Sequence, residues 1–373
     1  MRHKILCTLL ILLALVLLAC DKQENYTDLQ VGTAIEETNV IIEGRQYTYI
    51  KYCLLNRGYI RVVSAKTADE TLVIPSRIQG YPVTEIGGEY SGVPEESVEI
   101  RDKRRRWLVD EKQELDQLII SQGVREIDKE TFQGLKVREV ELPESLDVIN
   151  SYAFANSEIN RVVVKSKDVM MRSSVFSHST LREIQLPSEF KGQFGSRCFE
   201  KSNIESFQWP AYGMGDENQI GWGAFMGCSH LREVVFPENQ ENIYIPEATF
   251  SECELLKNLI FPESTGKVTF RFSPYADNCN GGVETLIVKG TDTEIAGCEY
   301  KGKGDYNFIT VKRIVAPKKS KASIFAQKAL RVGYLAEWIQ DDAKRGDFQE
   351  NYSEGYGDDV KLVPVEYEIN NKN

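Results

Sequence analysis

Residues 127–148 read IDKETFQGLKVREVELPESLDV, and residues 149–170 read INSYAFANSEINRVVVKSKDVM. Each segment has isoleucine at its first position and phenylalanine at its sixth. This pair of apolar residues recurs every 22 to 26 residues along the chain. The phenylalanines are Phe132, Phe154, Phe176, Phe199, Phe225 and Phe250, and the apolar residues five positions earlier are Ile127, Ile149, Met171, Phe194, Ile220 and Ile245. Such a period predicts a solenoid, in which each repeat buries its apolar face against its neighbours.

A short β-rich segment follows each phenylalanine, as in Arg138–Leu142 and Arg182–Leu186. Apolar and polar residues alternate in these segments, and this predicts half-buried strands. The expected inward residues at the strand centres are Leu118, Val140, Val162, Ile184, Phe207, Val234, Leu259, Leu286 and Ile314, with Leu72 before them and Val98 as an optional further member. The sequence thus predicts about eleven stacked parallel strands.

Seven prolines stand three residues after these strand centres, at Pro75, Pro143, Pro187, Pro210, Pro237, Pro262 and Pro317. Proline has no amide proton to give to a ladder, so we expect it to end each strand and to turn the chain outward.

The repeats resemble the leucine-rich repeats of BspA-like bacterial surface proteins. The resemblance is carried by Ile74–Gly87, Ala153–Asn156, Ala224–Cys228 and Leu231–Val234, and it extends over roughly residues 45–340. It implies a leucine-rich-repeat solenoid with short parallel strands on the concave face and irregular coil or turns on the convex face. It also implies a role as a surface antigen or adhesin, although a fold does not carry a function with it.

The N-terminus has the layout of an export signal. Residues 1–19 combine a basic start with an apolar run that is too short to span a bilayer comfortably. Leu17-Leu18-Ala19-Cys20 resembles the bacterial lipoprotein cleavage box, which implies a lipid on Cys20. The alternative is an uncleaved membrane anchor. We expect residues 20–42 to form a flexible tether to the cell envelope, and the resemblance favours the outer membrane with possible surface exposure.

Both ends of a solenoid need a cover. We expect residues 43–70 to form an N-terminal cap, because two β-rich segments flank Asn56-Arg57-Gly58 as in a hairpin. Residues 71–316 would hold the repeats. Apolar residues at helical spacing between residues 321 and 340 predict a helical cap over residues 317–345, and residues 346–373 remain an acidic tail of unassigned role.

The sequence offers no candidate catalytic, metal or cofactor site. After removal of the signal, His178 and His230 are the remaining histidines, and no zinc, phosphate-loop or nucleophile-elbow motif is present. We therefore expect neither an enzyme nor a small-molecule substrate. The formal charge of −11 argues against nucleic acid as a partner. Cys228 and Cys253 recur three residues after the phenylalanine, which favours buried free thiols over a disulfide between repeats.

Two surface features are candidate binding sites. One is the basic cluster at residues 101–106, which we interpret as a solvated segment balanced by nearby acids rather than as a site for anionic glycan or lipid. The other lies on the outer face of the strands. Four apolar residues occupy successive outward positions there, flanked by polar ones: Val235, Ile260, Ile287 and Val315, with Glu233, Asn258, Thr285 and Arg313. The competing interpretation is that β-branched residues merely suit strands.

From these observations we expect a cell-envelope lipoprotein that binds a protein or glycan through its leucine-rich-repeat sheet. The alternative is a periplasm-facing scaffold that recognises components of its own cell envelope.

Overall fold

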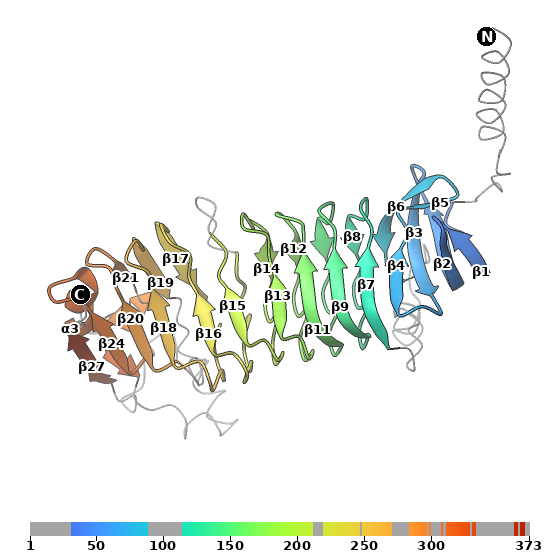
Figure 1. Cartoon of the computed structure of the whole chain (residues 1–373). Coiled ribbons are helices and arrows are strands. Elements are labelled where there is room, and N and C mark those ends of the chain that lie inside the picture. Colours follow the sequence, from blue (N-terminus) through green and yellow to red (C-terminus); the bar gives the residue numbers. More distant parts are fainter. Residues whose placement is uncertain are drawn as a thin grey trace, which may run out of the picture.

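The computed structural model is an elongated coil of stacked repeats, with the N-terminal strands at one end and the C-terminal strands at the other (Figure 1). It describes residues 31–88, 114–211, 219–246, 248–270, 283–296, 298–299, 307–308, 311–328, 330–332, 362–364 and 366–369. The predicted signal peptide, Cys20, Val98 and the basic cluster at 101–106 lie outside these residues. Of the described helices, none has the length and apolar character needed to cross a membrane.

One long face of the coil is a parallel sheet, here called the main sheet, which is built in two parts. The first part contains β4 (Thr71–Ile74), β7 (Leu115–Ile120), β9 (Lys136–Leu142), β11 (Glu158–Val164) and β13 (Glu183–Gln185). The second contains β15 (Ser206–Gln208), β16 (Glu233–Val235), β18 (Asn258–Phe261), β20 (Thr285–Val288), β24 (Arg313–Ala316) and β27 (Glu366–Ile369).

The strand register is the one that the sequence predicts. Leu72 pairs with Leu118, Leu118 with Val140, and Val140 with Val162. The same alignment holds in the second part, where Leu286 pairs with both Leu259 and Ile314. These centres are buried, since only inward positions can stack on the neighbouring repeat. β4 pairs directly with β7, so no other strand lies between these two in the sheet. The sixth strand of the second part is β27, from the predicted tail, which pairs with β24.

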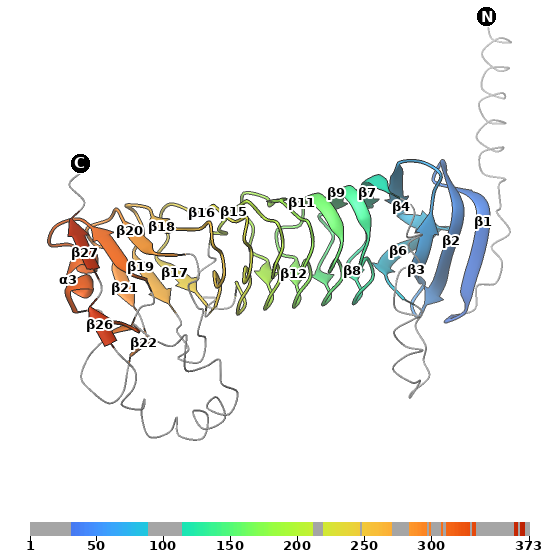
Figure 2. The same ribbon diagram turned by 90° about the horizontal axis from the view of Figure 1, so that it is seen from below.

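A second set of shorter strands lies across the core from the main sheet (Figure 2). Its first group is β6 (Tyr81–Ile86), β8 (Glu126–Ile127), β10 (Val148–Ile149), β12 (Met170–Met171) and β14 (Gln193–Phe194), with β5 (Arg77–Ile78) beside β6. Its second group is β17 (Asn242–Ile245), β19 (Lys267–Phe270) and β21 (Glu294–Ala296). The sequence predicts coil or turns here. The structure differs because the apolar residues five positions before the phenylalanines, such as Ile127 and Ile149, pair as short strands before the turns begin.

The phenylalanine column forms a continuous stack in the core. The ring centroids of Phe132 and Phe154 lie 5.1 Å apart, and those of Phe154 and Phe176 lie 5.4 Å apart. The stack continues through Phe199, Phe225 and Phe250, and the rings of each adjacent pair are stacked. Offset stacking at this spacing is favourable for aromatic rings and keeps each repeat aligned with the next.

The N-terminal cap is an antiparallel hairpin of β2 (Arg45–Leu55) and β3 (Tyr59–Lys66), as the sequence predicts. A third strand, β1 (Ala34–Ile42), pairs with β2. The predicted flexible tether therefore extends too far, because its last nine residues are held in the sheet. The polar composition that suggests a tether also suits an edge strand with one solvent-facing side.

The C-terminal cap contains a helix that is shorter than the predicted one. α3 spans Lys321–Lys328 and buries Ala322, Phe325 and Ala326. Residues after the helix form the strand β25 (Leu330–Val332), so the prediction that the helix continues toward residue 340 is wrong from Leu330 to Val332. Leu330–Val332 pairs with β26 (Leu362–Pro364), and such tertiary pairing overrides a weak helical period. A small sheet joins these two strands to β22 (Cys298–Glu299) and β23 (Asn307–Phe308).

Candidate binding face

The predicted apolar strip occupies one line across four neighbouring strands of the main sheet. Val235 on β16 pairs with Ile260 on β18, Ile260 pairs with Ile287 on β20, and Ile287 pairs with Val315 on β24. Each strip residue directly follows a buried strand centre, so alternation directs its side chain away from the core. Register therefore brings these four residues together from positions 25 to 28 residues apart in the sequence.

The four strip residues differ in exposure. Val235 is 41% exposed and Ile260 is 43% exposed, whereas Ile287 and Val315 are only partly exposed. Removing large apolar side chains from water stabilises a complex in proportion to the area buried. The part of the strip best able to contact a partner is therefore the pair Val235 and Ile260.

The predicted polar border of the strip is only partly present. Glu233, Asn258 and Arg313 are exposed, but Thr285 is only 4% exposed. The prediction that Thr285 borders the strip is therefore wrong. Strand alternation predicts the side of the sheet from which a side chain projects, and it does not predict what covers that side chain. At the end of the border, Arg313 Nη1 donates a hydrogen bond to Glu368 Oε2 of β27 at 3.2 Å.

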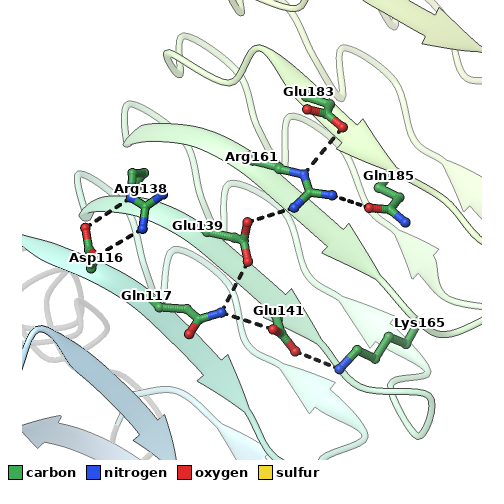
Figure 3. Close-up of polar contacts among 9 residues, drawn as sticks. All are labelled: Asp116, Gln117, Arg138, Glu139, Glu141, Arg161, Lys165, Glu183 and Gln185. Atoms are coloured by element: carbon green, nitrogen blue, oxygen red, sulfur yellow. Dashed lines mark hydrogen bonds and ion pairs between the residues drawn. The ribbon is translucent and has the colours of Figure 1, made fainter.

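The outer face of the N-terminal half is different, because a polar network covers it (Figure 3). Gln117 Nε2 donates to Glu139 Oε1 at 3.2 Å and to Glu141 Oε1 at 3.0 Å. Arg161 Nη1 donates to Glu139 Oε2 at 2.9 Å, and Lys165 Nζ lies 2.6 Å from Glu141 Oε2. We call these five residues, with Glu183 and Gln185, the polar ladder.

Arg161 joins the polar ladder to β13. Its Nε lies 3.4 Å from Glu183 Oε1, and its Nη2 donates a hydrogen bond to Gln185. The hydrogen bond to Glu139 is the main cause that raises the pKa of Arg161. Similarly, the hydrogen bond from Arg138 lowers the pKa of Asp116 at the edge of this face. The donors and acceptors of the ladder thus already have partners within the chain.

The sequence analysis did not identify the polar ladder. Its members are separated by 22 or 24 residues, which is the repeat length, or that length plus two positions along the strand. Side chains of opposite charge at that spacing are the feature of the sequence that could have predicted the ladder. The most exposed apolar side chains of the strip, Val235 and Ile260, lie outside the ladder, in the second part of the main sheet.

The described residues show no metal site, since they contain no group of three or more His, Cys, Asp or Glu that could hold an ion. His178 and His230 are both exposed and lie on the turn side of the repeats. Where the pKa of a carboxyl group is shifted, a basic neighbour lowers it, as Lys312 does for Glu284. This is the behaviour of ordinary surface ion pairs.

Cys228 and Cys253 are buried thiols outside any disulfide, as predicted, and Cys53 and Cys198 are also buried. The thiol of Cys228 donates to the carbonyl oxygen of Phe199 at 2.9 Å, and that of Cys253 donates to the carbonyl oxygen of Phe225 at 3.0 Å. Burial raises the pKa of Cys228 to about 12. These thiols therefore connect neighbouring repeats as weak hydrogen-bond donors.

Comparison with known proteins gives a consistent picture of the repeats. Six copies of the BspA type leucine rich repeat region match residues 110–214 and 215–276. No curated protein sequence matches the chain.

Among solved structures, a leucine-rich-repeat protein of T. pallidum is 23% identical, with 56% of this chain and 87% of that chain covered at a TM-score of 0.40. A leucine-rich-repeat protein of Bacteroides ovatus is 18% identical, with 74% and 70% covered at a TM-score of 0.39. The pneumococcal vaccine antigen PcpA is 16% identical, with 80% and 97% covered at a TM-score of 0.31.

The assignment of the repeats rests on the matched residues and on the register of the strands. The matched region begins just before β7 and ends after β19, and it includes all six stacked phenylalanines. Residues 110–276 of this chain therefore belong to the BspA-type leucine-rich-repeat family.

Proposed function

We propose that the chain is a lipid-anchored protein of the bacterial cell envelope that binds a macromolecular partner, either a protein or a glycan. Binding occurs through the outer face of the second part of the main sheet. The observation that carries this proposal is the exposed pair Val235 and Ile260 within a line of four apolar residues. The leucine-rich-repeat architecture supports it, because stacked repeats form extended binding surfaces.

The contrast between the two parts of the main sheet supports the choice of surface. A partner that approached the polar ladder would have to break hydrogen bonds such as that between Arg161 and Glu139. A partner that covers Val235 and Ile260 displaces water from two apolar side chains, which have no hydrogen bonds of their own to lose. Binding at Val235 and Ile260 therefore removes fewer polar groups from water than binding at the polar ladder would.

The anchor in this proposal is a lipid on Cys20, for which the support is the sequence Leu17-Leu18-Ala19-Cys20. A strip of four residues exposes at most a few hundred Å², so a single copy would bind weakly. Many copies tethered to one membrane raise the effective concentration, and this compensates for weak single sites.

The test is an array of immobilised matrix proteins, mucins and polysaccharides, probed with multimers of the chain that starts at residue 21. The variant Val235→Asp with Ile260→Asp is probed beside it. We expect the wild-type protein to bind at least one class of ligand and the variant to lose that signal. If the variant binds as well as the wild type, the strip is not the binding surface.

Protease treatment of intact and permeabilised cells tests the location separately. Cleavage on intact cells is expected for a surface-exposed adhesin. Cleavage only after permeabilisation would favour the periplasm-facing scaffold instead. Release of the protein into the medium on Cys20→Ser substitution is expected if the lipid is the anchor.

A further inference from the structure

The main sheet is interrupted in the middle of the coil. β13 and β15 are adjacent repeats, yet they belong to different sheets. In the described part of the chain, one backbone hydrogen bond joins their N-terminal ends, from Glu205 N to the carbonyl oxygen of Arg182 at 3.2 Å. Elsewhere in the main sheet neighbouring strands pair directly. The two parts of the sheet are therefore only weakly connected along this face.

The short strands across the core are interrupted one repeat later. β14 continues only as an isolated bridge between Phe194 and Ile220, and the group that contains β17 is a separate sheet. The repeat that contains β15, Ile220 and Phe225 is therefore attached to the following repeats through β15 and to the preceding repeats through Ile220. We call this repeat the junction repeat.

The turn side of the coil is continuous through the junction repeat. Phe176 N donates to Cys198 O at 2.8 Å, Phe199 N to Ala224 O at 2.8 Å, and Phe225 N to Thr249 O at 3.0 Å. The rings of Phe199 and Phe225 stack with centroids 5.1 Å apart. The turn side of the coil thus keeps its hydrogen bonds on both sides of the junction repeat. Each of the two sheet sides is interrupted at one interface, the main sheet between β13 and β15 and the short strands between Ile220 and β17.

The core is less well covered where the main sheet is interrupted. Ile184 and Leu186 of the repeat containing β13 are partly exposed, whereas the residues at the same positions in the other main-sheet strands from β4 to β24 are buried. The next strand centre is Phe207, where most other repeats have a smaller β-branched or leucine side chain. The first strand after the interruption therefore carries a bulkier inward residue than β13 does.

Two buried polar atoms of the junction repeat lack hydrogen bonds within the described residues. They are the indole nitrogen of Trp209, whose side chain is almost fully buried, and Oε1 of Gln219. A buried polar group without a partner destabilises the conformation that buries it. Opening of the coil at this repeat would let water reach these groups, so their burial lowers the cost of opening.

We infer that the solenoid bends at the junction repeat, as a hinge between two rigid blocks. The first block carries the polar ladder, and the second carries the apolar strip. Bending about the continuous turn side changes the angle between these two surfaces. This inference does not depend on the identity of any partner.

The test measures distances between spin labels within the full chain by pulsed electron resonance. Labels attached to introduced ketone side chains leave the native cysteines unmodified. Three pairs of exposed positions, each two residues before a strand centre and three repeats apart, provide one test and two controls. The test pair is Asn160 and Arg232, which spans the junction, and the control pairs are Asp116 with Arg182 and Arg232 with Lys312.

We expect the Asn160–Arg232 distance distribution to be broader than both controls, by more than the rotamer spread of the label. Because Arg232 occurs in the test pair and in one control, a mobile label at that position would broaden both and would be recognised. Three distributions of equal width would overturn the hinge. Circular dichroism of each labelled protein verifies that the fold is retained.

Discussion

Phe176 shows how much a single residue contributes to this fold. Its ring lies between those of Phe154 and Phe199, at centroid distances of 5.4 and 5.7 Å, and its side chain is fully buried. Phe176→Ala should lower the free energy of unfolding by about 3–5 kcal/mol, because it leaves a cavity between two repeats. Chemical denaturation followed by circular dichroism measures this loss. The matched control is Gln185→Ala, an exposed position for which we expect a change within about 0.5 kcal/mol.

Cys228 allows a prediction about pH. Its pKa is raised to about 12 because the thiol is buried, so the folded protein holds this proton well above the pKa of an unfolded cysteine. The contribution of this thiol to stability is therefore complete below about pH 8.5 and is lost as pH rises toward 12. At pH 8 we expect alkylation of Cys228 by iodoacetamide to be slow in the native protein and fast in denaturant, as measured by mass spectrometry. Fast alkylation of the native protein would contradict the buried position.

At the residue scale, the sequence predicts which side chains face the core. The phenylalanine column and the predicted strand centres in the described residues, apart from the partly exposed Ile184, are buried because their period is also the period of the coil. Thr285 is misassigned by this reasoning, because it occupies an outward position of the repeat and yet its side chain is buried. The repeat period predicts the direction of a side chain, and it does not predict whether other parts of the chain cover that side chain.

At the scale of single elements, the polar ladder adds order to the outer face of β7, β9, β11 and β13 but little stability. Arg161 forms ion pairs with Glu139 and Glu183, and all three side chains contact solvent. Exposed ion pairs contribute about 1 kcal/mol or less and weaken in salt. Arg161→Met should therefore lower the free energy of unfolding by no more than about 1 kcal/mol at low ionic strength, and by less in 1 M salt.

Denaturation curves at the two ionic strengths measure this effect, with Arg172→Met, an exposed arginine on the turn side, as the control for a general change in charge. A loss of several kcal/mol that salt does not reduce would show that the ladder has a larger structural role than its exposure indicates.

Long strands are predicted well from sequence, and very short elements are not. β9 and β11, with seven residues each, alternate over enough residues to reveal a period of two, and Pro143 follows the end of β9. Several strands across the core, such as Val148–Ile149, have two residues and therefore show no period. α3 is shorter than predicted because helical spacing continues by chance into a segment that pairs as a strand.

At the scale of the whole molecule, stability should be distributed along the coil as a series of contacts between neighbours. β27 covers the open edge of β24, with Ile314 paired to Tyr367. Deletion of residues 365–373 should therefore accelerate amide hydrogen exchange in β24 and leave β9 and β11 unchanged. Hydrogen exchange followed by mass spectrometry measures this, and equal acceleration in all strands would indicate that the coil unfolds as one cooperative unit.

The solenoid architecture follows from the repeat period, whereas the location and the partner of the protein do not. A period constrains which residues stack, but it carries no information about which molecule approaches the outer face. The candidate strip could be predicted because register places Val235, Ile260, Ile287 and Val315 in one line. The polar ladder depends on contacts between particular side chains, such as Arg161 with Glu139, and the period of the apolar residues does not describe these contacts.

The most direct test of the proposed binding face compares two double variants in the same outward column of the main sheet. Val235→Asp with Ile260→Asp places charge on the strip, and Ile119→Asp with Val163→Asp places the same charge on the N-terminal half. The dissociation constant of each variant for the ligand found on the array is measured by surface plasmon resonance, with thermal unfolding as the control for folding. We predict that the strip variant loses binding and that the N-terminal variant retains it. Equal loss in both variants, or retention by the strip variant, would contradict the proposed binding face.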